Sequence, residues 1–240
     1  MTLQRLREMA FRRWVYRDAH YLVADVELDP DRARRFVPWP LRLATPPRAN
    51  LFLAFFPHTA FGSVYREAGL FLDVTHLGRR AVYSPWMLVD DDVALILGRE
   101  LLGYPKKLGE FTWQLDGDRI SASAHRRGHT LITMTGTLGA SIATPPPILG
   151  RPHRNIRASA GIAIPKVIAF SPKERVCDVR AAELAVTITG SERDPLHEMG
   201  LGRVLGARLH RVDLGGAMPP LPVGAVSPLA YAKHLLLRSH

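Results

Sequence analysis

The stretch Gly98-Arg99-Glu100-Leu101-Leu102-Gly103-Tyr104-Pro105-Lys106-Lys107-Leu108-Gly109 places two adjacent lysines directly after a Tyr-Pro pair. The chain has 32 basic residues, but only those at 106, 107, 166, 173 and 233 are lysines, and the rest are arginines. A chain that so strongly prefers arginine has therefore used lysine twice in succession here. Lysine differs from arginine in that its ammonium can lose a proton and become a nucleophilic amine. The stretch thus indicates amine chemistry.

A lysine amine is a useful nucleophile only where its surroundings disfavour the ammonium. In water, with a lysine pKa near ~10.4, about one side chain in ~2500 is neutral at pH 7, and lowering that pKa to about 6–7 takes roughly 5–6 kcal/mol. Burial in an apolar pocket or a second cation nearby can supply this free energy. Lys107 could be the cation, and the apolar walls could come from Leu101, Leu102, Leu108, Phe111 and Trp113. Without further context, two solvated lysines on a turn after Pro105 are the favoured interpretation of the pair.

The segment 98–109, read as GRELLGYPKKLG, resembles the active-site signature of the acetoacetate decarboxylase family, in which Gly-Arg-Glu precedes Tyr-Pro-Lys-Lys. The similarity extends more weakly from about residue 21 to 111, through Val37-Pro38-Trp39-Pro40-Leu41 and Tyr65-Arg66-Glu67-Ala68-Gly69. The resemblance implies that Lys106 forms a Schiff base with a ketone, and that the protonated iminium acts as the electron sink; acetoacetate decarboxylase is itself the standard example of a lysine activated by a neighbouring cation or by desolvation. Lys107 then corresponds to that neighbouring cation.

The same alignment predicts the remaining site residues and two departures. Glu67 falls on a family glutamate and is expected to move protons to and from the enamine. A second family glutamate falls on Phe52, and the family arginine falls on Ala19. Because a carboxylate in a dry pocket needs a partner, and residues two apart on a strand share a face, Arg17 is expected to substitute for that arginine. Phe52 makes the pocket more apolar, which suits either desolvation of the substrate carboxylate or a different carbonyl compound.

Three residues of the signature are assigned supporting roles. Arg99 and Glu100 are expected to position the segment through ion pairing, since both charges need partners if they are buried. Tyr104 is expected to bound the pocket, and the following proline stiffens the backbone that carries the lysine.

The pattern along the chain predicts a mostly-β protein. Strands are expected near residues 21–28, 51–56, 70–74, 81–89, 93–97, 108–115, 119–125, 131–138, 162–170, 185–189 and 204–214. Short helices are expected at 30–36, near 195–200 and at 228–237. Residues 90–92, an Asp triplet, are interpreted as a solvated hairpin turn, and 58–67 as a loop. Many strands with few peripheral helices indicate an antiparallel barrel or sandwich. The family resemblance implies a closed, cone-like β-barrel in a single domain of residues 1–240, assembled into a homo-oligomer.

Composition narrows the classes of function. The single Cys177 excludes an internal disulfide framework and fits a reducing compartment. No apolar run is long enough to span a membrane, and no signal-peptide core precedes the first strand, so a cytoplasmic location is expected. The net charge of +10 comes from scattered arginines, and nucleic acid is not expected as a partner. Only residues 1–17 concentrate them, with apolar residues at spacings that suit a basic amphipathic helix. Such a helix is expected to pack within the protein or its oligomer; the alternatives are contact with an anionic membrane surface or with phosphates.

The sequence lacks the motifs of nucleotide-binding proteins and of the common serine hydrolases. The chain has no G-x-x-x-x-G-K-[ST], no G-x-G-x-x-G opening a helix and no G-x-S-x-G. His125 and His129 have the spacing of paired ligands on a helix, but the strand-like alternation around Gly128 argues against one. No metal and no organic cofactor is therefore expected. The leading hypothesis is a Schiff-base decarboxylase of a β-keto acid. The alternatives are a Schiff-base enzyme with aldol, dehydration or exchange chemistry on another carbonyl compound, and a non-catalytic small-molecule binder.

Overall fold

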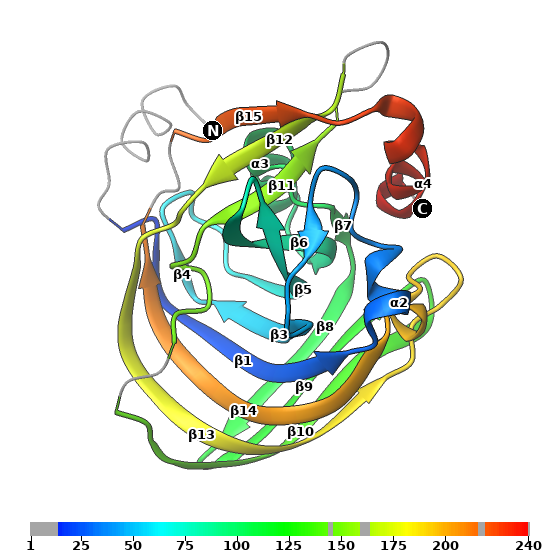
Figure 1. Cartoon of the computed structure of the whole chain (residues 1–240). Helices are drawn as coiled ribbons and strands as arrows, with labels where there is room; N and C mark the ends of the chain where they lie inside the picture. Colours follow the sequence, from blue (N-terminus) through cyan, green and yellow to red (C-terminus); the bar gives the residue numbers. More distant parts are fainter. Residues whose placement is uncertain (1–13, 144–145, 159–163, 216–218, 240) are drawn as a thin grey trace.

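The computed structural model describes residues 14–143, 146–158, 164–215 and 219–239, and most of them lie in strands (Figure 1). The strands are β1 (Tyr16–Leu28), β2 (Arg42–Leu43), β3 (Arg48–Phe56), β4 (His58–Thr59), β5 (Tyr65–His76), β6 (Arg79–Val89), β7 (Lys106–Leu108), β8 (Glu110–Asp116), β9 (Arg119–Arg126), β10 (His129–Ser141), β11 (His153–Arg157), β12 (Lys166–Phe170), β13 (Glu174–Ile188), β14 (Leu201–Leu214) and β15 (Leu221–Ala225). The helices are α2 (Pro30–Arg34), α3 (Asp92–Leu102), α4 (Pro228–Ser239) and a 3-10 turn at Leu196–Glu198. The mostly-β prediction is confirmed.

All of these strands join one curved sheet. Its order is β15-β12-β11-β6-β5-β3-β1-β14-β13-β10-β9-β8, with β2 on β5, β4 on β1 and β7 on β6. The pairs β6–β7 and β6–β11 are parallel, so the sheet is mixed, and the prediction of a purely antiparallel one is wrong. The reason is local, because α3 carries the chain from the end of β6 back to the start of β7 beside it, as a crossover connection requires. Closure into a barrel is not shown by the pairing of the described strands.

The two faces of the sheet carry different cores. Alternate residues of a strand point to opposite faces. One face, with Leu22, Leu51, Leu70 and Leu88, packs with α2 and α4 into an aliphatic-rich cluster. The other face gathers most of the buried aromatic rings, and we call it the aromatic cluster: its rings are Tyr21, Phe52, Phe56, Phe61, Tyr65, Phe71, Tyr104 and Phe170.

Two predicted elements near the lysine pair differ in the structure. Residues 93–97 are helical, because Asp91 is the N-cap of α3 and its side chain accepts a hydrogen bond from Ala94 N at 2.7 Å; the Asp triplet thus starts a helix and is no hairpin turn. Glu67 lies in β5 and not in a loop. Of the expected N-terminal helix, residues 1–13 lie outside the described residues, and Tyr16 and Arg17 begin β1.

In the part of the chain that the structure describes, no helix has the length and apolar character needed to cross a membrane. The same part contains no group of three or more His, Cys, Asp or Glu side chains arranged to hold a metal ion.

Candidate active site

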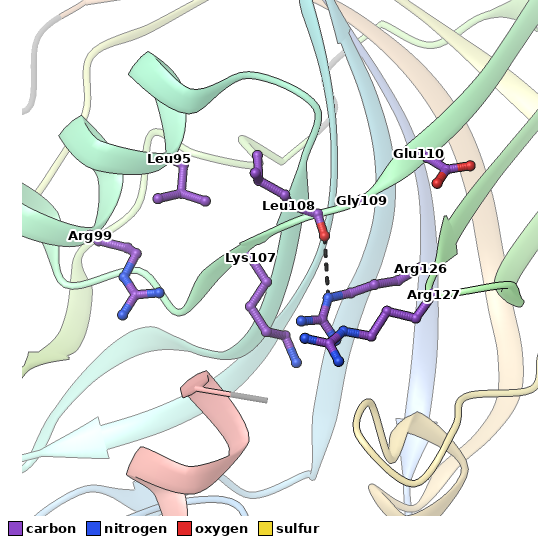
Figure 2. Close-up of a pocket in the computed structure, with 8 residues that line it drawn as sticks. All are labelled: Leu95, Arg99, Lys107, Leu108, Gly109, Glu110, Arg126 and Arg127. Carbon is purple, nitrogen blue, oxygen red and sulfur yellow. Dashed lines mark hydrogen bonds between the residues drawn. The ribbon is translucent and has the colours of Figure 1, made fainter.

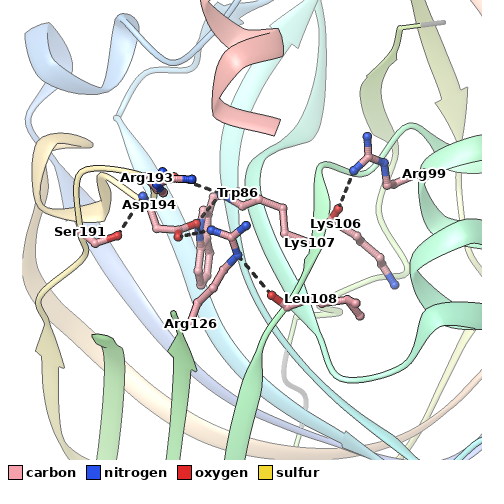
Figure 3. Close-up of polar contacts among 9 residues, drawn as sticks. All are labelled: Trp86, Arg99, Lys106, Lys107, Leu108, Arg126, Ser191, Arg193 and Asp194. Atoms are coloured by element: carbon pink, nitrogen blue, oxygen red, sulfur yellow. Dashed lines mark hydrogen bonds and ion pairs between the residues drawn. The ribbon is translucent and has the colours of Figure 1, made fainter. Parts of the chain in front are cut away.

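Both lysines of the signature lie in β7, and the strand directs their side chains to opposite faces of the sheet. The strand runs parallel to β6, with Lys106 beside Met87 and Lys107 beside Leu88. Because neighbouring residues on a strand point to opposite faces, Lys106 and Lys107 point in different directions, as Figure 3 shows, and Lys106 lies beside Tyr65 and Tyr104 of the aromatic cluster. The two ammonium groups therefore have different partners.

Lys106 forms a buried ion pair with Glu67. Its Nζ lies 2.6 Å from Glu67 Oε2, and each side chain is only 7% exposed. The Nζ also lies 5.8 Å from the ring centre of Tyr65 and 5.9 Å from that of Tyr104. The structure thus brings together three residues that the sequence singled out, Lys106, Glu67 and Tyr104, and adds Tyr65, which sequence reasoning did not assign.

The local sequence explains how Lys106 is held. Gly103 ends α3 in the left-handed region, at φ 69°, a conformation that glycine adopts without steric cost. The chain then turns through Tyr104 and Pro105 into β7. Arg99, on the last turn of α3, donates from its guanidinium to the carbonyl oxygen of Lys106 at 3.2 Å. This contact is a hydrogen bond to the backbone, whereas the sequence suggested ion pairing. Glu100 is exposed, and its carbonyl accepts from Arg157.

Gly98 provides the space for the lysine side chain. A Cβ at this position would lie 2.7 Å from both Cδ and Cε of Lys106 and 3.2 Å from its Nζ. These separations are well below van der Waals contact, so any larger residue at 98 must displace the amine.

The variant Gly98→Ala should lose activity without losing stability. Alanine favours the helix by about 1 kcal/mol over glycine, whereas a displacement of about 1 Å of a reacting group can cost about 10²-fold in rate. We expect turnover to fall by roughly that factor while the melting temperature holds or rises, measured by activity assay and thermal denaturation. Gly206→Ala is the control, since a Cβ there meets no atom within 4 Å. Unchanged turnover in Gly98→Ala would show that the position of the amine does not matter.

Apolar groups separate Lys106 from Phe52. Register places Lys106, Met87, Gly69 and Phe52 in one row across β7, β6, β5 and β3. The Phe52 ring lies directly over Gly69, since a Cβ on Gly69 would be 2.5 Å from its Cζ. Phe52 is fully buried and packs on Phe71 at 4.9 Å between ring centres. The residues beside Lys106 in this row are therefore apolar and buried, and position 52 holds a phenyl ring in place of a carboxylate.

His153 contacts the Tyr104 ring edge to face and forms a hydrogen bond with its hydroxyl group. Burial lowers the pKa of His153 to about 3, so the imidazole is neutral at physiological pH. Its Nε2 donates to the carbonyl of Leu149 at 3.1 Å, which leaves Nδ1 to accept from the Tyr104 hydroxyl at 3.2 Å. The Tyr104 hydroxyl proton is thus directed at His153 Nδ1. Burial also raises the pKa of Tyr104 well above its usual value. His153 was missed from the sequence because it lies 49 residues from Tyr104.

Lys107 is bound by a carboxylate that the sequence did not reveal. Its Nζ forms an ion pair with Asp194, and donates to the carbonyl of Arg193 at 3.2 Å. Asp194 also accepts from Trp86 Nε1 at 2.9 Å and from Arg126 at 3.1 Å (Figure 3). Burial, only partly offset by Asp194, lowers the pKa of Lys107. In Asp194, burial raises the pKa, but Lys107, Trp86 and Arg126 together outweigh it, and the pKa is lowered.

Arg17 lies on the outer face of β1, against the prediction that it shares a face with Ala19. The pairing of β1 with β14 shifts between Tyr16 and Ala19, and Asp18 has φ 55°; such a bulge reverses the alternation of side chains. Ala19 is buried in the aromatic cluster, whereas Arg17 is exposed. Arg17 therefore does not fill the position of the family arginine.

The protein is mostly β, and the aromatic face of its sheet buries a lysine–glutamate pair. This arrangement is typical of proteins that use a lysine amine in catalysis. The chain belongs to the acetoacetate decarboxylase family: the family model described as Acetoacetate decarboxylase (ADC) matches residues 4–220. Acetoacetate decarboxylase 1 of Mesorhizobium japonicum is 35% identical over 105 residues, which are 44% of this chain and 42% of that protein. The match thus spans less than half the length of this curated relative.

Solved structures of low sequence identity share the fold. One, from structural studies of acetoacetate decarboxylase, has a TM-score of 0.76 at 19% identity, covering 94% of this chain and 98% of that chain. The enduracididine biosynthesis enzyme MppR has a TM-score of 0.72 at 17% identity, covering 85% of this chain and 86% of that chain. Another MppR structure is complexed with the condensation product of pyruvate and imidazole 4-carboxaldehyde. The fold of this chain is therefore shared by an acetoacetate decarboxylase and by an enzyme of enduracididine biosynthesis.

Proposed function

We propose that this protein is a cofactor-independent Schiff-base enzyme that decarboxylates acetoacetate or a related β-keto acid. The observation that carries the proposal is the buried contact of 2.6 Å between Lys106 Nζ and Glu67 Oε2. A proton can pass along this contact from the ammonium to the carboxylate without bringing net charge into the apolar interior, where an isolated charge is expensive. The product of that transfer is a neutral amine beside a carboxylic acid.

The neutral amine attacks the ketone carbon of the substrate. Glu67, now protonated, supplies the proton with which the carbinolamine oxygen leaves as water, and a protonated imine remains on Lys106. The carbon–carboxylate bond then breaks, its electron pair moves into the imine, and carbon dioxide and an enamine result. A proton taken up from solvent through Glu67 adds to the enamine carbon. Hydrolysis of the resulting iminium by water releases the ketone and returns Lys106 as the ammonium beside the Glu67 carboxylate. Tyr65 and Tyr104 form the walls that limit access of bulk water to the pair.

In this proposal Lys107 does not act on Lys106 as a neighbouring cation. Lys107 points to the other face of β7 and is paired with Asp194. The desolvation explanation of lysine activation therefore suits this chain better than the neighbouring-cation explanation.

A second function uses the same amine for condensation with another carbonyl compound. Two observations favour it: Ala19 and Phe52 stand where decarboxylating members of the family have an arginine and a glutamate, and both are fully buried in the aromatic cluster. MppR, which has the same fold, has been solved with a condensation product. The decarboxylase and the condensing enzyme share the iminium and differ only in the bond broken or formed next to it.

Borohydride reduction in the presence of acetoacetate, followed by peptide mass spectrometry, tests both functions. An adduct on Lys106 together with release of carbon dioxide supports the decarboxylase. An adduct without carbon dioxide supports condensation chemistry, to be followed with aldehyde and 2-keto acid pairs. No adduct with any carbonyl compound contradicts both and leaves a non-catalytic binder.

The variant Glu67→Gln should slow the reaction by about 10²–10⁴-fold, which is the usual contribution of a positioned acid–base group. The amide oxygen can still accept a hydrogen bond from Lys106, but the side chain can no longer take a proton. We expect slow formation of the same adduct mass and a lower melting temperature, because Lys106 loses its buried counter-ion, so the rate is measured at a temperature at which the variant is folded. Glu27→Gln, on β1 in a half-exposed pair with Arg48, is the matched control. A rate equal to wild type in Glu67→Gln would remove Glu67 from the mechanism.

A further inference from the structure

A separate cleft lies on the reverse side of β7 from the Lys106–Glu67 pair. Its volume is about 710 Å³, and four cationic side chains line it: Arg99 from α3, Lys107 from β7, Arg126 from the end of β9 and Arg127 from the turn that follows (Figure 2). This volume is typical of a small-molecule site. The Lys106 side chain does not line the cleft, because Lys107 and Lys106 point to opposite faces, and Arg99 reaches Lys106 through a hydrogen bond to its backbone carbonyl.

Positive charge exceeds negative charge in this cleft. Lys107 and Arg126 share the single carboxylate of Asp194, one on each oxygen. Glu110 also lines the cleft, but Figure 2 shows its carboxylate directed away from the four cations. Among the described residues, no carboxylate lies within ion-pair distance of Arg127. The formal balance of the four cations against Asp194 and Glu110 is positive.

Arg127 occupies a backbone position that favours other residues. Residues Arg127 and Gly128 form the two-residue turn between β9 and β10, with φ of 51° and 78°. Turns of this kind favour Asn-Gly, Asp-Gly or Gly-Gly, because both central residues need positive φ. Arginine is a poor choice for the turn, and its side chain extends from it into the cleft beside Lys107 and Arg126 (Figure 2).

We propose that this cleft binds the phosphate group of a small anionic ligand. Guanidinium groups present paired N–H donors that match phosphate oxygens, and lysine adds a compact charge. Arg126 is already fixed in place by Asp194 and by its hydrogen bond to the carbonyl of Leu108 at 3.2 Å, so it is preorganised for an anion. Arg127 supplies the cation without a carboxylate partner, and Arg99 closes the opposite side.

The variant Arg127→Asn tests the site without endangering the fold. Asparagine removes the charge and is better suited than arginine to positive φ at this turn, so the melting temperature should hold or rise. We expect inorganic phosphate and pyrophosphate, titrated calorimetrically into the full-length protein at low ionic strength, to bind at one saturable site. The dissociation constant should rise about tenfold in Arg127→Asn, as expected for loss of one charge-assisted contact.

Two controls distinguish the cleft from general charge and from the lysine site. Arg119→Asn removes the same charge from an exposed position at the other end of β9 and should leave the dissociation constant unchanged. Lys106→Arg should also bind phosphate as the wild type does, because Lys106 faces away from the cleft. Absence of saturable phosphate binding, equal affinity in Arg127→Asn and wild type, or an equal loss in Arg119→Asn would each overturn the proposal. A loss confined to Lys106→Arg would place the anion at the lysine site instead.

Discussion

Replacing Lys106 with arginine should reduce turnover at least about a thousandfold and abolish the borohydride-trapped adduct. Arginine retains the positive charge and can still pair with Glu67, but its guanidinium does not lose a proton in a protein and cannot become the amine nucleophile. Loss of a covalent nucleophile is among the largest single-residue effects in catalysis. Carbon dioxide release and adduct mass, measured on acetoacetate and a small panel of β-keto acids, give the two readouts.

The matched control is the same substitution one residue further on. Lys107→Arg keeps the charge beside Asp194 on the other face of β7, so the adduct on Lys106 should persist. The pair of variants therefore separates the chemistry of an amine from the electrostatics of the signature. Full activity in Lys106→Arg would end the Schiff-base proposal, whereas loss of the adduct in Lys107→Arg would restore the neighbouring cation as a cause.

The sequence sufficed for the parts of the site that lie within one motif or one strand. The spacing of Tyr104 and Lys106, and the alignment of Glu67, identified residues that the structure places in contact around one Nζ. Alternation along strands likewise predicted a mostly-β fold, because each strand buries a different set of residues on each face. These features depend on local periodicity or on a motif match.

Other features depend on the register of distant strands, and no local pattern encodes them. Asp194 follows Ser-Glu-Arg in a segment that looks like an ordinary polar turn, yet it accepts from Trp86, which is 108 residues away. Arg17 was misplaced because the alternation rule fails at a bulge, and the left-handed Asp18 gives no sequence signal of it. The Asp triplet was misread because an N-cap and a turn favour the same residue.

Asp194→Asn should be the most destabilising conservative substitution on the Lys107 side of β7. Asp194 is 1% exposed and holds Lys107 and Arg126, whose side chains are 4% and 10% exposed. Asparagine keeps the shape and can still accept from Trp86, but it removes the carboxylate charge that the two buried cations share. Removing one partner of a buried ion pair typically costs about 3–5 kcal/mol. Urea or thermal unfolding measures this loss, and Asp118→Asn, in an exposed pair with Arg180, should cost less than about 1 kcal/mol.

The pH dependence of the difference in unfolding free energy between wild type and Asp194→Asn tests whether that difference is electrostatic. The pKa of Asp194 is lower in the folded protein than its ordinary value, which is near ~3.9 in the unfolded chain. A carboxyl group of this kind contributes stability that is fully present above the unfolded pKa and is lost as pH falls through the folded pKa. The stability gap between wild type and Asp194→Asn should therefore be constant from pH 7 to about 5 and shrink as the pH falls below about 4. A gap that keeps its full size at low pH would mean that Asp194 stabilises the fold by packing and hydrogen bonding, and that its charge does not hold Lys107 and Arg126 in place.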